Sequence, residues 1–378
     1  MLELSSPARA FERIEAYLRE HGFFAPGGEE LEADLYLGYG LSAPLRRHAT
    51  PLPPEPCPLP LAAVSVRDMQ GPGPDRSVQA RLRIGDWRRT WGDAEYAHAV
   101  ESVRAAIGRG DVYQVNLVQH LSARFAGSAA ALAARLAPLT QPNDAVFGDG
   151  DWRLFEAEGW AIVSASPELF LSRRGQRVWT RPIKGTRPLG ERDDLVASRK
   201  DAAEHVMIVD LERNDLSRIC VPGSVRWPEL MVAEPLAGVE HLVSTVEGEL
   251  RPDAGLAEIL GATFPGGSVT GAPKIAAVDL IAALEPVGRG ASMGALGRVY
   301  GNGDLDLVLT IRTFAIADGS IHLWVGGGIV WDSDPHGEVE ESLVKAEPLL
   351  AAIGAPLERS HVDRPRPRTG NALAGGER

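Results

Sequence analysis

Residues 161–180 read AIVSASPELFLSRRGQRVWT and contain three short segments of strand-like composition. These segments are Ala161–Ser164, Leu169–Ser172 and Arg177–Thr180. They follow one another without a helical pattern between them, whereas a doubly wound parallel sheet alternates strands with helices. The stretch therefore predicts an α+β fold.

The sequence on both sides of this stretch agrees with an α+β fold. Residues 112–125 alternate between apolar and polar side chains, with Gln114 and Asn116 on the polar face, which predicts a strand. Residues 96–107 carry apolar side chains at helical spacing, and two nearby glycines end that helix. Further strands are expected at 305–314 and 321–325, and further helices at 199–211 and 338–350.

The composition indicates a globular protein that does not bind nucleic acid. The formal net charge of −12 offers no positive surface for phosphates, although a few local cations can still hold a small anionic substrate. The two cysteines, Cys57 and Cys220, provide neither a disulfide framework nor a metal site, as in a reducing cytosol. No apolar run approaches the ~20 residues of a membrane span, and charges interrupt residues 1–20. We expect a cytoplasmic protein without membrane association.

One carboxylate lies on an apolar helical face in the second half of the chain. Glu204 shares that predicted face with Met207 and Leu211. A buried carboxylate needs a cation or a metal ion. An ion pair with an arginine such as Arg213 is the simpler hypothesis, and a metal site is the alternative.

Further carboxylates follow a predicted helix start. Asp334 is suited to the N-cap, with a proline in the first turn after it. Glu338, Glu341 and Lys345 then fall on one helical face. Acidic residues in a first turn usually face water. A second carboxylate that met Glu204 would instead complete an oxygen site suited to Mg²⁺.

Two glycine-containing segments and one lysine also suggest chemistry. Gly326–Gly328 lies between an expected strand and this helix, where bare backbone permits an anion to approach, although a glycine triplet most often forms a tight turn. Residues 264–274 are glycine-rich but lack the spacing of a phosphate-binding loop. Lys184 is by default a surface charge, and it becomes a nucleophile only if it is desolvated.

Over residues 90–350 the sequence resembles the chorismate-utilising enzymes. The strings that carry the resemblance occur in one order: GDVYQVNL (110–117), SPE (166–168), PIKGT (182–186), EHVMIVDLERNDL (204–216), VEHL (239–242), FPGGSVTGAPK (264–274), IRT (311–313) and residues 326–345. The resemblance implies two antiparallel sheets packed orthogonally as a sandwich and flanked by helices.

The resemblance also implies a domain organisation. Residues 1–90 form a short N-terminal region with a proline-rich connector and contribute to the sandwich, and residues 91–353 form the chorismate-binding catalytic domain. Residues 354–378 are rich in arginine and proline and poor in large apolar groups. We expect them to form a disordered tail, with a basic interaction tail as the alternative.

Site roles follow from the resemblance residue by residue. Glu204 and Glu341 resemble Mg²⁺ ligands, with Glu338 as a supporting carboxylate. Glu168 resembles the general acid that protonates the departing C4 hydroxyl, and His241 is a second candidate for proton transfer. The remaining expected contacts to chorismate are Gln114, Gly185, Thr186, Arg312, Gly326, Gly327, Gly328 and Lys345, with Arg312 as the bidentate clamp on the enolpyruvyl carboxylate.

Two positions distinguish subfamilies. Isochorismate and salicylate synthases have a water-activating lysine where this chain has Gln114, which cannot act as a base. Anthranilate synthases have alanine where this chain has Lys184. The PIKGT string resembles that of aminodeoxychorismate synthases, in which the lysine amine attacks C2 before ammonia attacks C4. The product, 4-amino-4-deoxychorismate, is the precursor of 4-aminobenzoate and folate.

Partners are implied as well. No segment resembles a glutamine amidotransferase, so we expect a separate amidotransferase subunit in a heterodimer and a downstream aminodeoxychorismate lyase. The polar segment 143–145 stands where relatives line a tryptophan pocket, so we expect no response to tryptophan. Anthranilate synthase component I and a non-catalytic chorismate-binding subunit are the alternative hypotheses.

Overall fold

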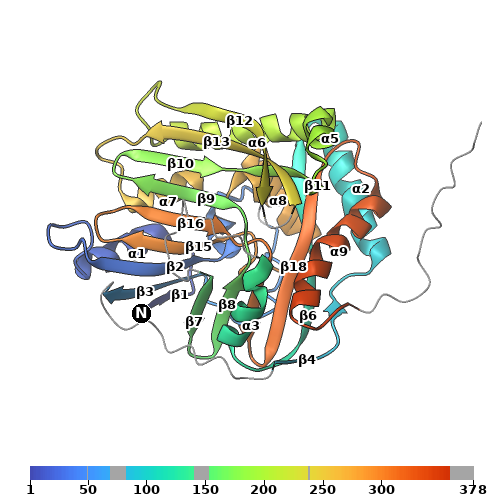
Figure 1. Ribbon diagram of the computed structural model, residues 1–378, viewed down its shortest axis with the longest axis horizontal. Coiled ribbons are helices and arrows are strands. Elements are labelled where there is room, and N and C mark those ends of the chain that lie inside the picture. The colour runs from blue at the N-terminus through green and yellow to red at the C-terminus, as the bar shows by residue number, and fades with distance from the viewer. Residues whose placement is uncertain (49, 69–81, 140–152, 237–238, 358–378) are drawn as a thin grey trace, which may run out of the picture.

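Two antiparallel sheets that cross one another form the body of the protein. The computed structural model describes residues 1–48, 50–68, 82–139, 153–236 and 239–357. In Figure 1 the strands of the larger sheet run from side to side, and the long strands β18 and β6 of the smaller sheet run from top to bottom. The predicted α+β fold with two antiparallel sheets is therefore confirmed. The segment 143–145 and most of the expected tail lie outside the described residues.

The larger sheet has ten strands, and it pairs strands from the N-terminal region with strands from residues 169–309. Its strand order is β1 (Leu2–Leu4), β3 (Ala62–Asp68), β2 (Leu31–Leu37), β15 (Ala295–Tyr300), β16 (Leu305–Leu309), β9 (Leu169–Arg174), β10 (Arg177–Arg181), β13 (Val239–Glu249) and β11 (Ile183–Pro188), and β12 (Arg226–Leu236) also pairs with β13. The N-terminal strands thus belong to the same sheet as β15, which pairs with β2 along its whole length. The strands predicted at Leu169–Ser172 and Arg177–Thr180 are confirmed in this sheet, and the strand predicted at Ala161–Ser164 is confirmed in the smaller sheet.

The smaller sheet has eight strands and is centred on β6 and β18. Its order is β14 (Gly271–Ala272), β6 (Gln114–Ala126), β18 (Ser320–Ile329), β17 (Thr313–Ala317), β8 (Trp160–Ser164) and β7 (Leu154–Ala157), and β4 (Arg83–Ile84) and β5 (Arg88–Arg89) pair with β6. Residues 114–121 are buried on both faces of β6. The single strand expected at 305–314 is wrong, because the chain leaves the larger sheet after β16 and enters the smaller one at β17.

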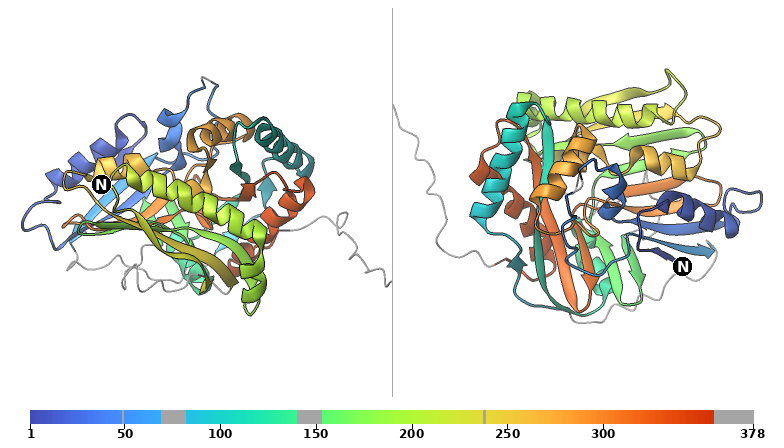
Figure 2. Two further views of the ribbon diagram at one scale, coloured as in Figure 1. Left: turned by 90° about the horizontal axis from the view of Figure 1, so that it is seen from above. Right: turned by 180° about the vertical axis from the view of Figure 1, so that it is seen from behind.

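Helices cover the outer faces of both sheets. They are α1 (Ala10–Glu20), α2 (Asp93–Arg109), α3 (Ala129–Leu136), α5 (Arg192–Ala197), α6 (Arg199–Ser217), α7 (Leu256–Thr263), α8 (Lys274–Leu284) and α9 (Pro335–Ala352), with the 3₁₀ turns η1 (Tyr39–Leu45), η2 (Ala137–Leu139) and η3 (Gly267–Val269). Figure 2 shows α6 lying over the larger sheet and α9 beside β18. Asp334 caps α9 by accepting the Gly337 N–H at 2.7 Å, as predicted. No described helix is long and apolar enough to cross a membrane.

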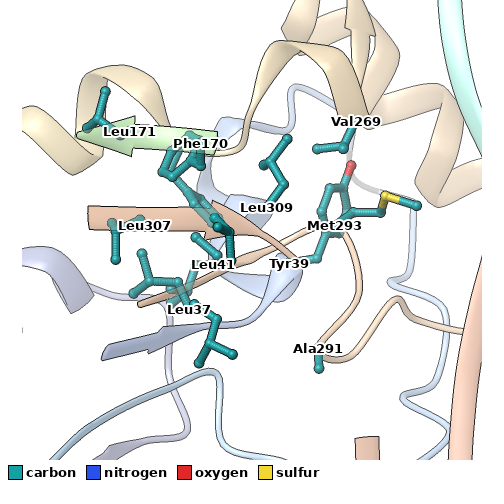
Figure 3. Close-up of a cluster of buried hydrophobic side chains, with 14 of the residues drawn as sticks. Leu37, Tyr39, Leu41, Phe170, Leu171, Val269, Ala291, Met293, Leu307 and Leu309 are labelled. Atoms are coloured by element: carbon teal, nitrogen blue, oxygen red, sulfur yellow. The ribbon is translucent and has the colours of Figure 1, made fainter. Parts of the chain in front are cut away.

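The hydrophobic core reaches the turn η3. Figure 3 shows Val269 of η3 beside Met293 and Tyr39, with Leu309 and Phe170 further along the same cluster. The fully buried Arg289 lies with its guanidinium 4.5 Å from the Tyr39 ring centroid and donates to the Val269 carbonyl at 2.9 Å. The core therefore fixes one end of η3.

A buried histidine pair lies inside the smaller sheet. His120 of β6 and His322 of β18 are stacked, with 3.0 Å between His120 Nε2 and His322 Nδ1. The Thr90 hydroxyl lies 2.6 Å from His120 Nδ1. Burial lowers the pKa of His120 to about 3 and the pKa of His322 to about 4. Both rings are therefore neutral at neutral pH.

Candidate active site

Lys184 lies on β11 with its amine directed at the turn η3. Its Nζ donates to the Ser268 carbonyl at 3.4 Å. Burial lowers the pKa of the Lys184 amine, while the negative charges of Glu168 and Glu204 act in the opposite direction. The side chain is thus not an ordinary surface charge, since desolvation moves it towards the free amine that a nucleophile requires.

Glu168 is buried beside Lys184. It precedes β9 in the larger sheet, is 5% exposed, and accepts the Ile183 N–H at 3.4 Å. Burial raises the pKa of its carboxyl, although the positive charge of Lys184 opposes the shift. A carboxyl that holds its proton to higher pH is suited to general acid catalysis. The structure therefore brings an acid and an amine to one place.

A β-bulge shapes the next part of the site. The register between β11 and β13 shifts between Lys184 and Arg187, and Gly185 adopts a φ of 64°. The Gly185 carbonyl lies 2.8 Å from His241 Nδ1, so the His241 proton resides on Nδ1 in the neutral ring. Thr186 Oγ1 lies 3.3 Å from the same nitrogen. His241 Nε2 is buried and has no hydrogen-bond partner in the described part of the chain.

Burial also determines the proton affinity of His241. It lowers the pKa of the imidazole to about 4, and the hydrogen bond to Gly185 only partly opposes this. A neutral ring with a bare Nε2 can accept a proton or a hydrogen bond, but it has no Nε2 proton to give. The position therefore fits an acceptor better than a second general acid.

The glycine triplet forms part of strand β18 and not a tight turn, which was the alternative to an anion-binding backbone. Gly326, Gly327 and Gly328 pair with residues 118, 117 and 116 of β6. A Cβ on Gly326 would lie 1.9 Å from the Leu117 carbonyl oxygen, and one on Gly328 would lie 2.1 Å from the Gln114 Nε2 atom. Only glycine permits this approach of the two strands.

Gln114 contributes an unpartnered amide to the same region. Its side chain is fully buried, and neither Nε2 nor Oε1 has a hydrogen-bond partner among the residues described. The Oδ1 atom of Asn116 shares this property. Such atoms require a polar partner when buried. They mark the site as one that receives a polar ligand.

The predicted acidic residues come from two helices. Glu204 lies on α6, and both Glu341 and Glu204 act electrostatically on Lys184. A Cβ on Gly327 would lie 3.4 Å from Glu338 Oε2, 3.5 Å from Glu341 Oε1 and 3.1 Å from Lys345 Nζ. Glu338, Glu341 and Lys345 therefore converge on the middle of the glycine triplet.

Two residues of α9 at the glycine triplet have defined polar partners. Glu338 accepts the Ser333 hydroxyl at 2.6 Å. Lys345 Nζ lies 2.8 Å from Glu341 Oε1 and donates to the Gly326 carbonyl at 3.0 Å. Arg213, which was considered as a partner for Glu204, pairs with Asp210 at 2.6 Å. Within the described residues, no three acidic, histidine or cysteine side chains are grouped closely enough to hold a metal ion by themselves.

Arg312 connects the two sheets at the site. It lies between β16 and β17, where the chain crosses from one sheet to the other. Its φ of 48° places it in the left-handed region that bulky residues avoid. Burial lowers the pKa of its guanidinium, and the negative charge of Glu168 opposes this. Strained backbone of this kind often occurs at functional sites.

Sequence reasoning missed two residues of the site. Ser268 contributes a backbone carbonyl to Lys184, and Glu212 of α6 accepts the Gly267 N–H at 3.0 Å. Both residues lie within strings that resemble the family, but no side-chain pattern indicates that a carbonyl faces a lysine. Only the packing of α6 against η3 reveals them.

Comparisons with known proteins identify the family of the chain. A family model described as chorismate binding enzyme matches residues 60–351. The chain is 40% identical over 272 residues to aminodeoxychorismate synthase component 1 of Klebsiella aerogenes, which covers 70% of this chain and 59% of that protein. It is 39% identical over 275 residues to anthranilate synthase component 1 of Streptomyces coelicolor, which covers 71% of this chain and 53% of that protein.

A solved structure extends the comparison to the fold. Anthranilate synthase component I from Streptococcus pneumoniae has a TM-score of 0.72 and 27% identity, and the match covers 88% of this chain and 84% of that chain. The chain spans less than two thirds of the length of the two relatives named above, at 59% and 53%. The match to the family model and the shared fold nevertheless lead to one conclusion: the chain belongs to the family of chorismate-binding enzymes.

Proposed function

We propose that this chain is an aminodeoxychorismate synthase component I, which converts chorismate and ammonia to 4-amino-4-deoxychorismate and water. Identity does not decide between this function and anthranilate synthesis, because relatives of both kinds are 40% and 39% identical. The observation that carries the proposal is Lys184, a partly buried amine whose pKa is lowered by burial and which lies beside the buried carboxyl of Glu168.

The proposed reaction has two substitutions. In the first, the free amine of Lys184 forms a bond to C2, the ring double bond shifts, and the C4–O bond breaks. Glu168 donates its proton to the departing hydroxyl, which leaves as water. In the second, ammonia bonds to C4, the double bond shifts back, and the C2–N bond to Lys184 breaks. The lysine amine is regenerated, the ammonium group formed at C4 returns one proton to the Glu168 carboxylate, and the C4 hydroxyl has been replaced by an amine.

Mg²⁺ is part of the proposal, held by Glu204 and Glu341 with Glu338 in support. The donor set fits this ion, since Mg²⁺ is commonly bound by one or two carboxylates together with oxygens of the substrate and water. When bound, the ion would neutralise the ring carboxylate of chorismate. Arg312 would clamp the enolpyruvyl carboxylate, and the buried amide of Gln114 would supply a neutral hydrogen-bonding group next to the ring.

The proposal includes two partners. Glutamine-derived ammonia would come from a separate amidotransferase subunit, and an aminodeoxychorismate lyase would consume the product. The name component 1 in the relative from Klebsiella aerogenes is consistent with a second component.

A product assay tests the proposal. The purified chain, chorismate and Mg²⁺ are incubated with an ammonium salt or with glutamine, and products are separated by liquid chromatography with mass detection. We expect 4-amino-4-deoxychorismate from ammonia and none from glutamine, and we expect added lyase to convert the product to 4-aminobenzoate and pyruvate. Anthranilate, which is fluorescent, as the main product would contradict the proposal, and so would glutamine-dependent turnover by the single chain.

A further inference from the structure

The Ser268 carbonyl that contacts Lys184 lies between two residues that are held in place. On one side, Arg289 donates to the Val269 carbonyl at 2.9 Å. On the other side, the Gly267 N–H donates to Glu212 Oε1 at 3.0 Å. The Ser268 hydroxyl interacts with the Glu168 carboxyl, the buried acid of the same site. The contacts of Val269 and Gly267 restrain the backbone on both sides of the Ser268 carbonyl.

Glu212 belongs to a buried cluster that also fixes the ends of the 264–274 loop. The Lys274 amine is ion-paired with Asp215, one turn after Glu212 on α6, and donates to the Thr263 carbonyl at 3.1 Å. Glu212 and Asp215 are 4% and 3% exposed. The loop is thus tied to α6 at both ends through Lys274 and in its middle through Glu212.

The contact between Glu212 and Gly267 has little freedom. A Cβ on Gly267 would lie 2.6 Å from Leu211 Cδ2 and 3.0 Å from Glu212 Oε1, so α6 and the loop are in direct contact. A buried backbone N–H without an acceptor costs about as much free energy as a lost hydrogen bond. Removing the Glu212 carboxyl would leave the Gly267 N–H without this acceptor, and the loop would have to move to find another.

We propose that Glu212 is a positioning residue for Lys184, acting through the Gly267 N–H to fix the Ser268 carbonyl that holds the lysine amine. This inference rests on the proposed role of Lys184 as the nucleophile. Glu212 itself touches neither Lys184 nor the reacting atoms. Its function is to keep the Lys184 amine in the position from which it attacks C2. A displacement of about 1 Å in a reacting group can reduce a rate by about 10²-fold.

The charge state of Glu212 agrees with a purely positional role. Burial, followed by the negative charge of Asp215, raises the pKa of Glu212 to about 8, while Lys274 and the Gly267 N–H oppose the shift. Glu168, before β9, is the other charged group that acts on it, and it also raises the value. The carboxyl is thus largely protonated at neutral pH, and a neutral side chain with the same acceptor oxygen should replace it.

The test uses lysine labelling as a readout that needs no turnover. The chain has only four lysines, at positions 184, 200, 274 and 345, so trace acetylation by acetic anhydride can be mapped by mass spectrometry. Labelling of Lys184 is measured relative to Lys345 without substrate, in the wild type and in Glu212→Ala, Glu212→Gln and Gly267→Ala. Asp210→Ala, an exposed change on the same helix, is the matched control.

We expect relative labelling of Lys184 to rise about threefold or more in Glu212→Ala, because the released loop opens the region around the amine. The turnover number should fall about 10–100-fold with little change in KM for chorismate. Glu212→Gln should resemble the wild type in both measurements, since it keeps an oxygen for the Gly267 N–H. Gly267→Ala should reproduce the alanine effect from the other side of the contact, and it carries the test if Glu212→Ala does not fold.

Two outcomes would overturn the inference. Unchanged labelling of Lys184 in folded Glu212→Ala and Gly267→Ala would show that the loop does not position the lysine. A Glu212→Gln variant as impaired as Glu212→Ala would show that the acidic proton, and not the acceptor, is needed. If the wild type made anthranilate, the proposed function would fail, but the labelling result would still decide the positional role.

Discussion

The two walls of the site differ in how far their charged and titratable side chains are exposed to solvent. On the wall formed by β11, β13, η3 and the segment before β9, Glu168 and His241 are 5% and 3% exposed, and burial shifts the pKa values of both, as it shifts that of Lys184. On the wall formed by β18 and α9, the side chains of Lys345 and Glu341 are 42% and 54% exposed and pair with each other. The first wall is suited to breaking bonds with groups of altered proton affinity. The second is suited to exchanging ions, because exposed pairs are weak and easily rearranged.

The largest effect is expected on the first wall. Lys184→Ala removes the proposed nucleophile, so formation of 4-amino-4-deoxychorismate should fall on the order of 10³-fold or more. Residual chemistry should shift towards attack by ammonia at C2, and this is measured by resolving both products from one reaction. Lys184→Arg keeps the charge and serves as a control for electrostatics alone. C4 amination at the wild-type rate in Lys184→Ala would remove the covalent step from the mechanism.

Arg312 tests whether charge or geometry matters where the sheets meet. Arg312→Lys keeps a positive charge but loses the planar, bidentate donor pair. We expect kcat/KM for chorismate to fall about 10–100-fold, mainly through KM, because charge-assisted hydrogen bonds contribute about 1.5–3 kcal/mol. Steady-state kinetics over a range of chorismate concentrations measure the effect. An unchanged KM would indicate that Arg312 serves only to stabilise the crossover from β16 to β17.

The carboxylates of α6 and α9 that are proposed to hold Mg²⁺ should respond mainly in metal dependence. Glu204→Gln and Glu341→Gln keep shape but remove charge, so the Mg²⁺ concentration for half-maximal activity should rise about 10–100-fold in each. The maximal rate at saturating Mg²⁺ should change less. Glu347→Gln, an exposed change further along α9, is the matched control. Wild-type Mg²⁺ dependence in both variants would favour the simple ion-pair hypothesis for these carboxylates.

The last two predictions concern the dependence of stability on pH. His120 and His322 titrate near pH 3 and 4 when folded but near 6.5 when unfolded, so the unfolded chain binds more protons in that window. Their contribution to stability is present above about pH 6.5 and is lost as the pH falls. We expect the contribution of the pair to the free energy of unfolding to fall by about 4 kcal/mol between pH 7 and pH 5, about 2 kcal/mol for each ring, measured by chemical denaturation.

Glu212 should act in the opposite direction. Its folded pKa of about 8 exceeds its ordinary value of 4.5, so its contribution to stability is present at low pH and is lost as the pH rises from about 4.5 to 8. Glu212→Gln should therefore remove a loss of stability between about pH 4.5 and pH 8, so the free energy of unfolding should rise more steeply with pH over this range than in the wild type. A stability profile in Glu212→Gln that is parallel to that of the wild type between pH 4.5 and pH 8 would contradict a raised Glu212 pKa.

Local patterns predicted the parts of the fold that depend on neighbours in sequence. The strands of residues 161–180, the strand β6 and the Asp334 cap of α9 follow from periodicity and capping preference. The split of the 305–314 segment did not follow, because an arginine at a φ of 48° gives no signal in residue type. The place of the glycine triplet inside β18 did not follow either, because the triplet permits the close approach of β6, a contact between residues about 210 positions apart.

The candidate site was predicted to the extent that its chemistry resides in side chains. Lys184 and Glu168 are brought together, and Glu341, Glu338 and Lys345 converge as expected. The Ser268 carbonyl and its support by Glu212 were missed because a backbone acceptor leaves no trace in the sequence and a buried glutamate looks like any helical glutamate. Such contacts depend on how α6 packs against η3, which only the tertiary structure defines.

The bulge at Gly185 bears on how products could diverge within such a scaffold. The extra residue in β11 is accommodated by a glycine at a φ of 64°, and a Cβ there would lie 2.6 Å from Leu195 Cδ1. Backbone conformation and lack of space therefore disfavour every residue except glycine at position 185. Position 184 has no positive φ, and its side chain faces the site. On the proposed mechanism, a single codon at position 184 would change the chemistry while the neighbouring glycine keeps the strand intact, so product choice would evolve without a change of fold.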